Sequence, residues 1–297
     1  MKNKIYDLSE ITAVIVLYST TDLVFKCLDK INGLKIIIID NGKNDAQIIK
    51  LIKEKYSISK YFKSRKNLGF GRACNFALKY VKTQYTLLVE PDVIIEQSSI
   101  NYLLVTLKKY PNTAITTPRF VNENFKVIDY LGNFQEYGKG VVRNKLEEDI
   151  NNKLSKNLIE GDTCINFCLA AILLINNSII KKIGLFNKKI FLYWEDFDLC
   201  RRLKMNCIPI IKSFKSVAIH LERKSVKENF FNKFIMTVHN DKSAYIYFKV
   251  KKNHPIIFKR IFLYTFRFII YILIINLKKA LKNLARIYAI YLYLKSN

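Results

Sequence analysis

The feature that most constrains the fold is a regular alternation of apolar runs and helical patterns over residues 11–120. The runs at 11–18, 35–40 and 85–90 are almost continuously apolar, which is typical of strands covered on both faces. Helical patterns separate these runs, for example over 70–81. This alternation predicts an α/β fold with a mostly parallel, doubly wound sheet, in which ligands bind beyond the carboxyl ends of the strands.

The composition changes near the end of the chain and predicts two parts. Residues 121–165 are polar and irregular, and we expect a connecting hairpin and loop there. Strand and helix patterns then resume up to about residue 221. From residue 242 onward there are twelve Lys and Arg and no acid, so this segment carries +12 of the formal net charge of +26. We therefore predict a globular domain over 1–241 and a basic helical extension over 242–297.

The charge and the hydrophobic content limit the classes of protein that fit. Hydrophobic residues make up 50% of the chain, which excludes a disordered protein. A net charge of +26 indicates a polyanionic partner, which leaves nucleic acid, anionic lipid and a phosphorylated substrate open.

Cysteine usage and the first residues favour a cytoplasmic protein. The six cysteines contain no Cys-x-x-Cys pair, and we expect structural thiols in a reducing compartment rather than a metal site. Asp7 and Glu10 interrupt the start of the chain, so the apolar run that follows fits a buried strand better than a secretory signal.

Polar residues follow the predicted second strand (35–40) and a short predicted third strand (61–64). Asp40 and Asn41 close the second strand before Gly42, which places a carboxylate at the ligand-binding edge; the same residues also form a good turn. The stretch 67–72 opens a helix with two glycines and an arginine, which suits a phosphate at a helix N-terminus but also fits a simple loop-to-helix junction.

Acidic residues and a histidine mark three further strand and helix ends. Glu90 and Asp92 end the fourth strand and are suitable oxygen ligands for Mg²⁺ or Mn²⁺, or else solvated acids at a turn. Glu195 and Asp196 open a helix, where acids also favour the helix dipole. His220 ends a strand, as a structural residue or as a metal or phosphate contact.

Taken in order, these stretches resemble glycosyltransferase family 2, and within it the rhamnosyltransferase-like branch. Two positions depart from the family pattern: Ser19 stands where an Asn is usual, and Glu90-Pro91-Asp92 stands where Asn-Pro-Asp is common, which leaves Asp92 as the safer metal ligand. The matching stretches are VIVLYS (14–19), IIDNGKND (38–45), NLGFGRACN (67–75), VEPDV (89–93), YWEDFDLCRRL (193–203) and IHLERKS (219–225).

The resemblance implies a GT-A fold and an inverting, single-displacement transfer from a nucleotide sugar. It implies Asp196 as the general base that deprotonates the acceptor hydroxyl, with Glu195 as the alternative. Asp92, with Glu90, would hold Mg²⁺ or Mn²⁺ on the diphosphate, and His220 would contact the metal or the diphosphate. The residues implied for the donor nucleotide are Leu17, Tyr18, Asp40 and Asn41 at the base and ribose, and Asn67, Gly69 and Arg72 at the ribose and diphosphate.

The tail predicts attachment to a membrane surface rather than a membrane span. Lys259, Arg260 and Arg267 interrupt the apolar stretch 256–277, and its longest clean part is too short to cross a bilayer. Residues 278–289 form a basic amphipathic helix, which suits the interface of an anionic membrane. Packing of these helices on the catalytic domain is the alternative.

Together these observations predict a cytoplasmic glycosyltransferase attached peripherally to the inner face of the cell membrane. The acceptor would be a lipid-linked saccharide or surface polysaccharide, and the donor dTDP-rhamnose or, alternatively, a UDP-hexose. A non-catalytic binding protein on the same fold stays open. A nucleic-acid-binding protein is disfavoured because the basic residues are scattered and acids lie at the strand ends.

Overall fold

The computed structural model describes residues 6–128, 161–221 and 230–296. The chain divides into two compact units. The first, which we call the sheet unit, comprises 1–186 and 196–227. The second, the helical unit, comprises 187–195 and 228–297. The motif stretch 219–225 extends beyond the described residues after position 221.

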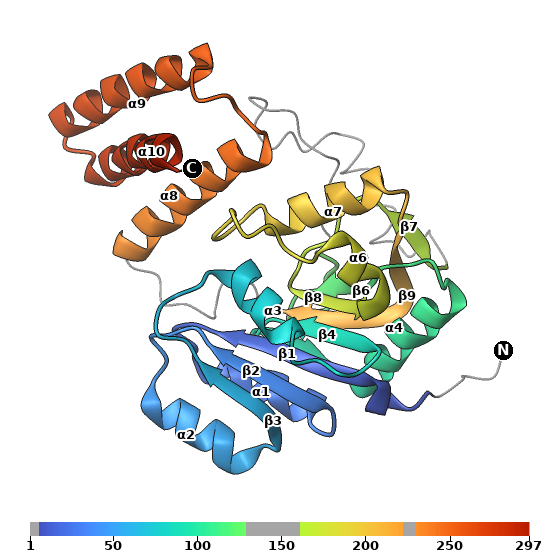
Figure 1. Ribbon diagram of the computed structural model, residues 1–297. Coiled ribbons are helices and arrows are strands. Elements are labelled where there is room, and N and C mark those ends of the chain that lie inside the picture. Colours follow the sequence, from blue (N-terminus) through green and yellow to red (C-terminus); the bar gives the residue numbers. More distant parts are fainter. Residues whose placement is uncertain (1–5, 129–160, 222–229, 297) are drawn as a thin grey trace. The chain divides into compact units, whose positions relative to one another are not determined.

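The sheet unit is built on one nine-stranded sheet, shown in Figure 1. The order of its strands is β3-β2-β1-β4-β8-β6-β9-β5, and β7 pairs with β9. The strands are β1 (Ile11–Leu17), β2 (Lys35–Asp40), β3 (Ile58–Lys63), β4 (Tyr85–Val89), β5 (Val93–Ile95), β6 (Ile115–Val121), β7 (Thr163–Ile165), β8 (Ile172–Asn176) and β9 (Ile210–His220).

The expectation of an α/β fold with a mostly parallel sheet is confirmed. β1 pairs in parallel with β2 and β4, and β2 pairs in parallel with β3. β8 runs antiparallel to β4 and β6, so that β6 and β9 again share the direction of β1. The short strands β5 and β7 run antiparallel to β9. The sheet is therefore mixed, with its antiparallel strands in the half that follows β4.

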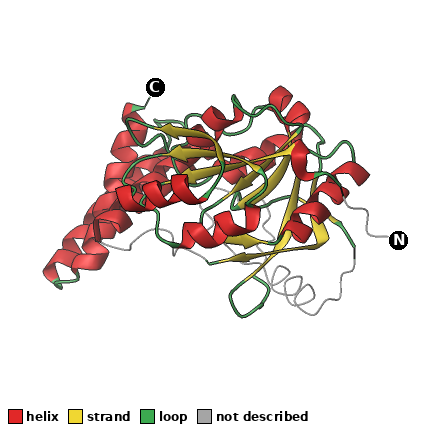
Figure 2. Cartoon of the chain, turned by 90° about the horizontal axis from the view of Figure 1, so that it is seen from below, coloured by secondary structure: helices red, strands yellow, loops and turns green. Residues whose placement is uncertain are grey.

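Helices cover both faces of the sheet (Figures 1 and 2), as the doubly wound prediction requires. Ile15 packs toward one face and Val16 toward the other, because side chains alternate along a strand. One face carries α1, α2 and α4, and the other carries α3, α6 and α7. These helices are α1 (Leu23–Ile31), α2 (Ala46–Lys55), α3 (Phe70–Leu78), α4 (Gln97–Lys109), α6 (Asn177–Ile183) and α7 (Glu195–Met205); a short 3₁₀ turn (Leu8–Glu10) precedes β1.

The helical unit contains α8 (Phe230–Tyr247), α9 (Pro255–Leu273) and α10 (Leu277–Lys295). His254 caps α9 and Asn276 caps α10, each with a side chain that accepts from a backbone N–H in the first turn. α10 packs against both α8 and α9. α8 extends across residue 241, where the composition changes, and the unit also includes the distant segment 187–195.

Within the described part of the chain, no helix has both the length and the hydropathy that crossing a membrane requires.

Candidate active site

The carboxylate of Asp40 lies at the end of β2, buried in a set of hydrogen bonds. Its Oδ1 accepts from the Nδ2 of Asn44 at 2.6 Å and from the backbone N–H of Gly42 at 3.0 Å. Its Oδ2 accepts from the hydroxyl of Tyr61 at 2.6 Å. Burial, together with this hydrogen bond, raises the pKa of Tyr61. Asp40 therefore organises the turn after β2 as well as placing a carboxylate beside the predicted binding site of the nucleotide base.

Asn41 fastens the end of β2 to the loop that opens α3. Its Nδ2 donates to the Oδ1 of Asn67 at 2.9 Å, and its Oδ1 accepts from the backbone N–H of Leu68 at 2.8 Å. The same Oδ1 of Asn67 accepts from the N–H of Gly69 at 2.8 Å. Gly69 has φ 77°, a conformation that glycine adopts without strain. Three of the residues predicted to contact the nucleotide, Asn41, Asn67 and Gly69, thus form one hydrogen-bonded group.

The other predicted nucleotide residues surround this group. Leu17 ends β1 opposite Asp40 in the register and is fully buried, so it contributes packing and backbone. Its carbonyl accepts from the backbone N–H of Asn41 at 2.7 Å. Tyr18 is half-buried, with the ammonium of Lys43 6.0 Å from its ring centre. Arg72 lies in the first turn of α3 with an exposed side chain.

Glu90, Asp92 and His220 meet beyond β4 and β9. The Nε2 of His220 lies 3.8 Å from the Oε2 of Glu90 and 4.0 Å from the Oδ1 of Asp92. Each of the three residues offers one ligand atom, and these atoms all lie within 4.8 Å of one another. Backbone pairing sets this arrangement, because β5 starts directly after Asp92 and pairs Val93 with His220.

The donor set fits a divalent cation. Among the described residues, the Oδ1 of Asp92 is a buried atom without a hydrogen-bond partner, and Asp92 is only 3% exposed. A buried carboxylate oxygen without a partner is costly. Two carboxylates and an imidazole within this distance suit Mg²⁺ or Mn²⁺, with water and phosphate completing the shell.

Negative charge is concentrated at this position. Burial, together with the charges of Asp92 and Asp196, raises the pKa of Glu90 to about 8. Carboxylates that repel each other in a buried setting favour either a bound proton or a bound cation. The interaction with Asp196 places the predicted base and the predicted metal ligands in the same part of the sheet unit.

Asp196 lies in the first turn of α7. Burial, partly offset by hydrogen bonds from backbone N–H groups that include those of Phe197 and Ala170, raises the pKa of Asp196 to about 6. The N–H of Phe197 is 2.8 Å from its Oδ1. A carboxylate with such a pKa is ionised at neutral pH and remains a useful proton acceptor.

The neighbouring acids of α7 differ from Asp196. Glu195 is buried and belongs to the helical unit, although it precedes Asp196 directly. Asp198 is buried and pairs with Arg202 at 2.8 Å. Arg202 also donates to the carbonyl of Gly184 at 2.7 Å, so Asp198 is part of a structural contact between α7 and the end of α6.

The residues before Glu195 are held within the helical unit. The Nε1 of Trp194 donates to the Oδ1 of Asn240 at 3.2 Å, and its ring lies 5.2 Å from that of Tyr247. The hydroxyl of Ser243 donates to the carbonyl of Leu192 at 2.8 Å. Tyr193 and Trp194 have φ values of 64° and 69°, an uncommon conformation for bulky residues. These contacts maintain that conformation, and no sequence pattern predicts them.

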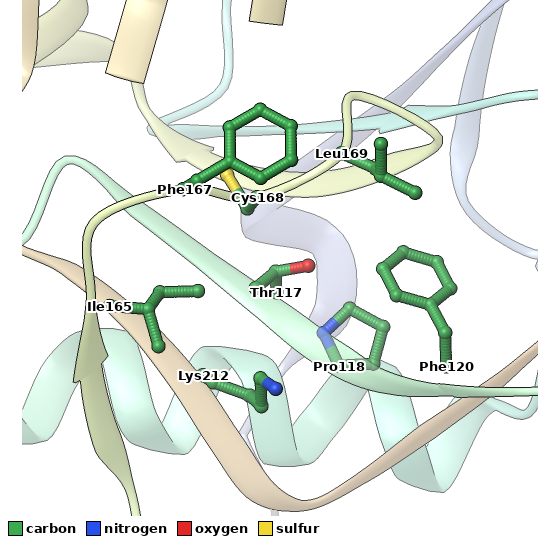
Figure 3. Close-up of a pocket in the computed structure, with 8 residues that line it drawn as sticks. All are labelled: Thr117, Pro118, Phe120, Ile165, Phe167, Cys168, Leu169 and Lys212. Atoms are coloured by element: carbon green, nitrogen blue, oxygen red, sulfur yellow. The ribbon is translucent and has the colours of Figure 1, made fainter. Parts of the chain in front are cut away.

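A small cavity in the sheet unit is lined by the residues that Figure 3 labels. Its volume is about 10 Å³, room for about one water molecule, and the ring of Phe120 on its wall lies 5.9 Å from that of His220. Its wall also includes Thr117, Phe167 and Lys212, all of them buried. This cavity is too small for a nucleotide. The residues predicted to bind the donor lie at the strand ends instead.

Sequence reasoning missed two residues of the nucleotide region. Tyr61 lies within β3, where an aromatic residue reads as ordinary strand packing, yet it donates to Asp40. Asn44 connects three segments through its side chain: its Nδ2 donates to the carbonyl of Leu17 at 3.1 Å, and its Oδ1 accepts from the N–H of Thr20 at 2.9 Å. The position of Asn44, an asparagine close after the end of β2, is the one feature of the sequence that could have indicated its role.

The cysteines are free thiols, as expected. The Sγ atoms of Cys168 and Cys200 lie 3.8 Å apart in the core. The hydrogen bond with Cys200 and burial raise the pKa of Cys168, so this thiol acts as a small apolar residue.

Comparison with known proteins then decides the family. Residues 12–173 match the family model described as glycosyl transferase family 2, which covers more than half of the chain. The chain belongs to glycosyltransferase family 2. It is also 30% identical over 207 residues to rhamnosyltransferase WbbL of Escherichia coli, a match that covers 65% of this chain and 76% of WbbL. The resemblance of the motifs to this family is confirmed.

Solved structures show the fold of this family 2 member. Its chain matches GalNAc-T7 with UDP, GalNAc and Mn²⁺ at a TM-score of 0.59 and 12% identity, over 82% of this chain and 48% of that one. It matches the mannosyltransferase PcManGT from Pyrobaculum calidifontis, in complex with GDP-Man and Mn²⁺, at a TM-score of 0.53 and 10% identity, over 80% and 63% of the two chains. The chain therefore spans about half to two thirds of these structures and has the GT-A fold.

Proposed function

We propose that this protein is an inverting glycosyltransferase that moves a sugar from a nucleotide diphosphate to a hydroxyl of a lipid-linked or surface-polysaccharide acceptor. The observation that carries the proposal is the convergence of Glu90, Asp92 and His220, with the charge of Asp196 close enough to raise the pKa of Glu90. A cation site next to an ionised carboxylate matches the needs of sugar transfer: charge neutralisation on the leaving group and a base for the acceptor.

The donor nucleotide would lie over the ends of β1 and β2. Asp40 and Asn41 face this edge in a turn held by Asn44 and Tyr61. The loop that begins at Asn67 is held by Asn41, so a nucleotide would meet a preorganised surface. Leu17, Tyr18 and Gly69 complete this side, and Arg72 would approach the diphosphate from the first turn of α3.

The two acidic groups would have separate roles. Glu90, Asp92 and His220 would hold Mg²⁺ or Mn²⁺, which when bound supplies Lewis-acid neutralisation of the departing nucleoside diphosphate. Asp196 would accept the proton of the attacking acceptor hydroxyl, while backbone N–H groups fix its orientation. Glu195 is the alternative base. Attack from the face opposite the leaving group would invert the configuration at the anomeric carbon.

The donor we propose is dTDP-rhamnose. The similarity to rhamnosyltransferase WbbL supports a deoxyhexose. A UDP-hexose is the second candidate, because the structural neighbours carry UDP with GalNAc and GDP-Man, which shows that the fold accommodates other nucleotide sugars.

The helical unit would attach the enzyme to the inner face of the cell membrane. The acid-free segment 242–297 supports this location, because anionic lipid attracts clustered Lys and Arg. In this arrangement residues 1–241 carry out the transfer and 242–297 bring the site to a lipid-linked acceptor.

A panel of nucleotide sugars tests the proposal. We expect slow hydrolysis of one donor, and this hydrolysis should require Mn²⁺ or Mg²⁺ and stop when EDTA is added. Asp92→Asn should abolish the hydrolysis and leave the fold intact. Hydrolysis by wild-type protein that continues unchanged with EDTA would contradict the metal role. Absence of both hydrolysis and transfer for every donor would favour a non-catalytic binding protein.

A further inference from the structure

α9 carries a continuous apolar stripe on its solvent-facing side. Its members follow one another at intervals of three or four residues, which places them on one face of a helix. Each of them is between 52% and 75% exposed, although all are large hydrophobic side chains. The stripe consists of Phe258, Phe262, Phe266, Ile269 and Leu273.

The opposite face of α9 already packs within the helical unit. Ile257 and Tyr264 are buried, and the guanidinium of Arg286 on α10 lies 5.2 Å from the ring of Tyr264. The stripe therefore is not the side by which α9 joins its own unit. A large exposed apolar surface of this kind indicates a binding partner.

The apolar surface continues around the turn between α9 and α10. Ile274 and Leu277 are exposed, and Ile275 is 81% exposed. Ile275 also has φ 54°, a conformation that a β-branched residue rarely adopts. A strained isoleucine whose side chain faces solvent is not explained by packing within the protein.

Charge identifies the partner chemistry. Lys259 follows Phe258 on α9, and Lys278, Lys279 and Lys282 follow the apolar turn at the start of α10; all four side chains are exposed. Segment 242–297 contains no acid that would repel an anionic surface. Lysines can rest their methylene chains on apolar surface and hold the ammonium at the level of lipid headgroups.

This apolar surface lies on α9, whereas the sequence pattern favours residues 278–289, on α10, for contact with the membrane. Residues 278–289 were expected to lie in the membrane interface, but Ala280, Ala285 and Ala289 of α10 are buried where that helix packs inside the unit. Leu281, Leu284 and Tyr288 of α10 are 38–43% exposed, whereas each member of the stripe on α9 is at least 52% exposed, so α9 presents the more exposed apolar face.

We propose that α9 and the turn after it, with the stripe and Ile274, Ile275 and Leu277, insert into the interfacial layer of an anionic membrane, while the neighbouring lysines contact lipid headgroups. This inference rests on the proposed function in one respect: it names the surface by which the enzyme would reach a lipid-linked acceptor. A helix that lies in the plane of the membrane does not need the length or hydropathy of a span.

Partitioning into vesicles tests the inference with the full chain. The probe is a vesicle of phosphatidylcholine with phosphatidylglycerol, compared with phosphatidylcholine alone. Phe262→Gln and Phe266→Gln keep a good helix former at each position and should each lower the partition coefficient about tenfold. Phe125→Gln is the matched control, because Phe125 is 73% exposed in the sheet unit and lies outside the stripe; it should leave partitioning unchanged.

Charge variants form a second arm. Lys259→Gln and Lys278→Gln should each weaken binding to anionic vesicles about fivefold and have little effect on neutral vesicles. Rising salt should reduce the difference between wild type and these variants, because it screens exposed charges. Circular dichroism and the fluorescence of Trp194, which lies in the helical unit, verify that the variants are folded.

Two results would overturn the inference. One is unchanged vesicle partitioning of the folded Phe262→Gln/Phe266→Gln protein. The other is that the wild-type protein forms a dimer without lipid, whereas the double variant is monomeric and partitions into vesicles as the wild type does. That result would assign the stripe to contact between two copies of the chain. Donor hydrolysis and transfer are measured on the same proteins in lipid-free buffer. Stripe-dependent binding to vesicles without hydrolysis or transfer would support this inference and contradict only the proposed function.

Discussion

The backbone N–H of Leu221 donates to the carbonyl oxygen of Asp92 at 3.0 Å. This bond continues the antiparallel pairing of β5 with β9 and fixes His220 beside Asp92 through the main chain. The geometry of the proposed cation site is therefore set by sheet hydrogen bonds as well as by the side chains of the proposed ligands. Ligand side chains can be replaced by others of the same size without loss of the strand pairing, which makes them suitable for mutational tests.

Asp92→Asn should remove most of the cation affinity and leave the fold intact. The amide keeps the size of the side chain but loses the negative charge of the buried Oδ1 atom. We expect at least a tenfold weaker Mn²⁺ affinity in the presence of nucleoside diphosphate, measured by electron paramagnetic resonance. Asp45→Asn is the matched control, because Asp45 caps α2 and asparagine caps equally well. Equal Mn²⁺ affinity in both variants would contradict the assignment.

Asp196→Asn should lower kcat by about 10²–10⁴-fold, because it removes the proposed general base, and should retain nucleotide binding. Steady-state kinetics and nucleotide titration provide the two readouts. Asp198→Asn is the control on the same helix: it breaks the pair with Arg202 and should reduce stability with little change in kcat. If Glu195→Gln lost more activity than Asp196→Asn, the base would be Glu195.

Asn41→Ala should weaken both the fold and donor binding. It leaves the N–H of Leu68 without its partner in a partly buried setting, at a cost of about 1–3 kcal/mol, while the Oδ1 of Asn67 keeps only the hydrogen bond from Gly69. Urea unfolding and calorimetric titration with nucleotide measure the two effects. Asn206→Ala, which removes an exposed hydrogen bond at the end of α7, should change neither by as much. A variant that is destabilised yet binds nucleotide normally would remove Asn41 from the donor site.

His239 should make the helical unit less stable in mild acid. Burial, with a smaller effect of Lys242, lowers the pKa of His239 to about 4, while its ring packs 4.2 Å from Phe191. The unfolded chain, with a histidine pKa near 6.5, binds more protons between these values. The stability that the protein gains by keeping His239 neutral is thus fully present above pH 6.5 and is lost as the pH falls toward 4.

We expect a loss on the order of 1–3 kcal/mol across this range, after allowing for the partial exposure of the ring. The fluorescence of Trp194, the single tryptophan, follows unfolding because it packs on Tyr247 and Phe248. His239→Gln removes the titrating group and should flatten the profile over this window. An unchanged pH dependence in that variant would assign the effect to other groups, of which buried Asp241 is the first to examine.

The strands that sequence reasoning located are those with continuous apolar runs. β1 is buried at every position, so its pattern was unambiguous. The apolar pattern predicts a strand only over 216–221, whereas β9 begins at Ile210. Lys212 and Ser213 are polar yet buried, and a pattern of apolar residues does not include them. β6 contains Pro118 and Arg119, which also obscure a strand.

The candidate site could be predicted only piece by piece. Motifs placed polar residues at strand ends, and parallel strands bring such ends to one edge. That His220 meets Asp92 depends on β5 pairing with β9, a long-range pairing that no local pattern encodes. For the same reason the contacts of Trp194 with α8 were not foreseen.

The helical unit is discontinuous in the sequence, and this limits how the chain can be divided. Shortening the protein before residue 228 would remove α8, and with it the partners of Phe191, Leu192 and Trp194. The backbone that leads into Asp196 would then lose the contacts that hold its left-handed residues. A truncated protein that failed to turn over would therefore not show that the tail takes part in the chemistry, and point substitutions on α9 are the cleaner way to separate attachment from transfer.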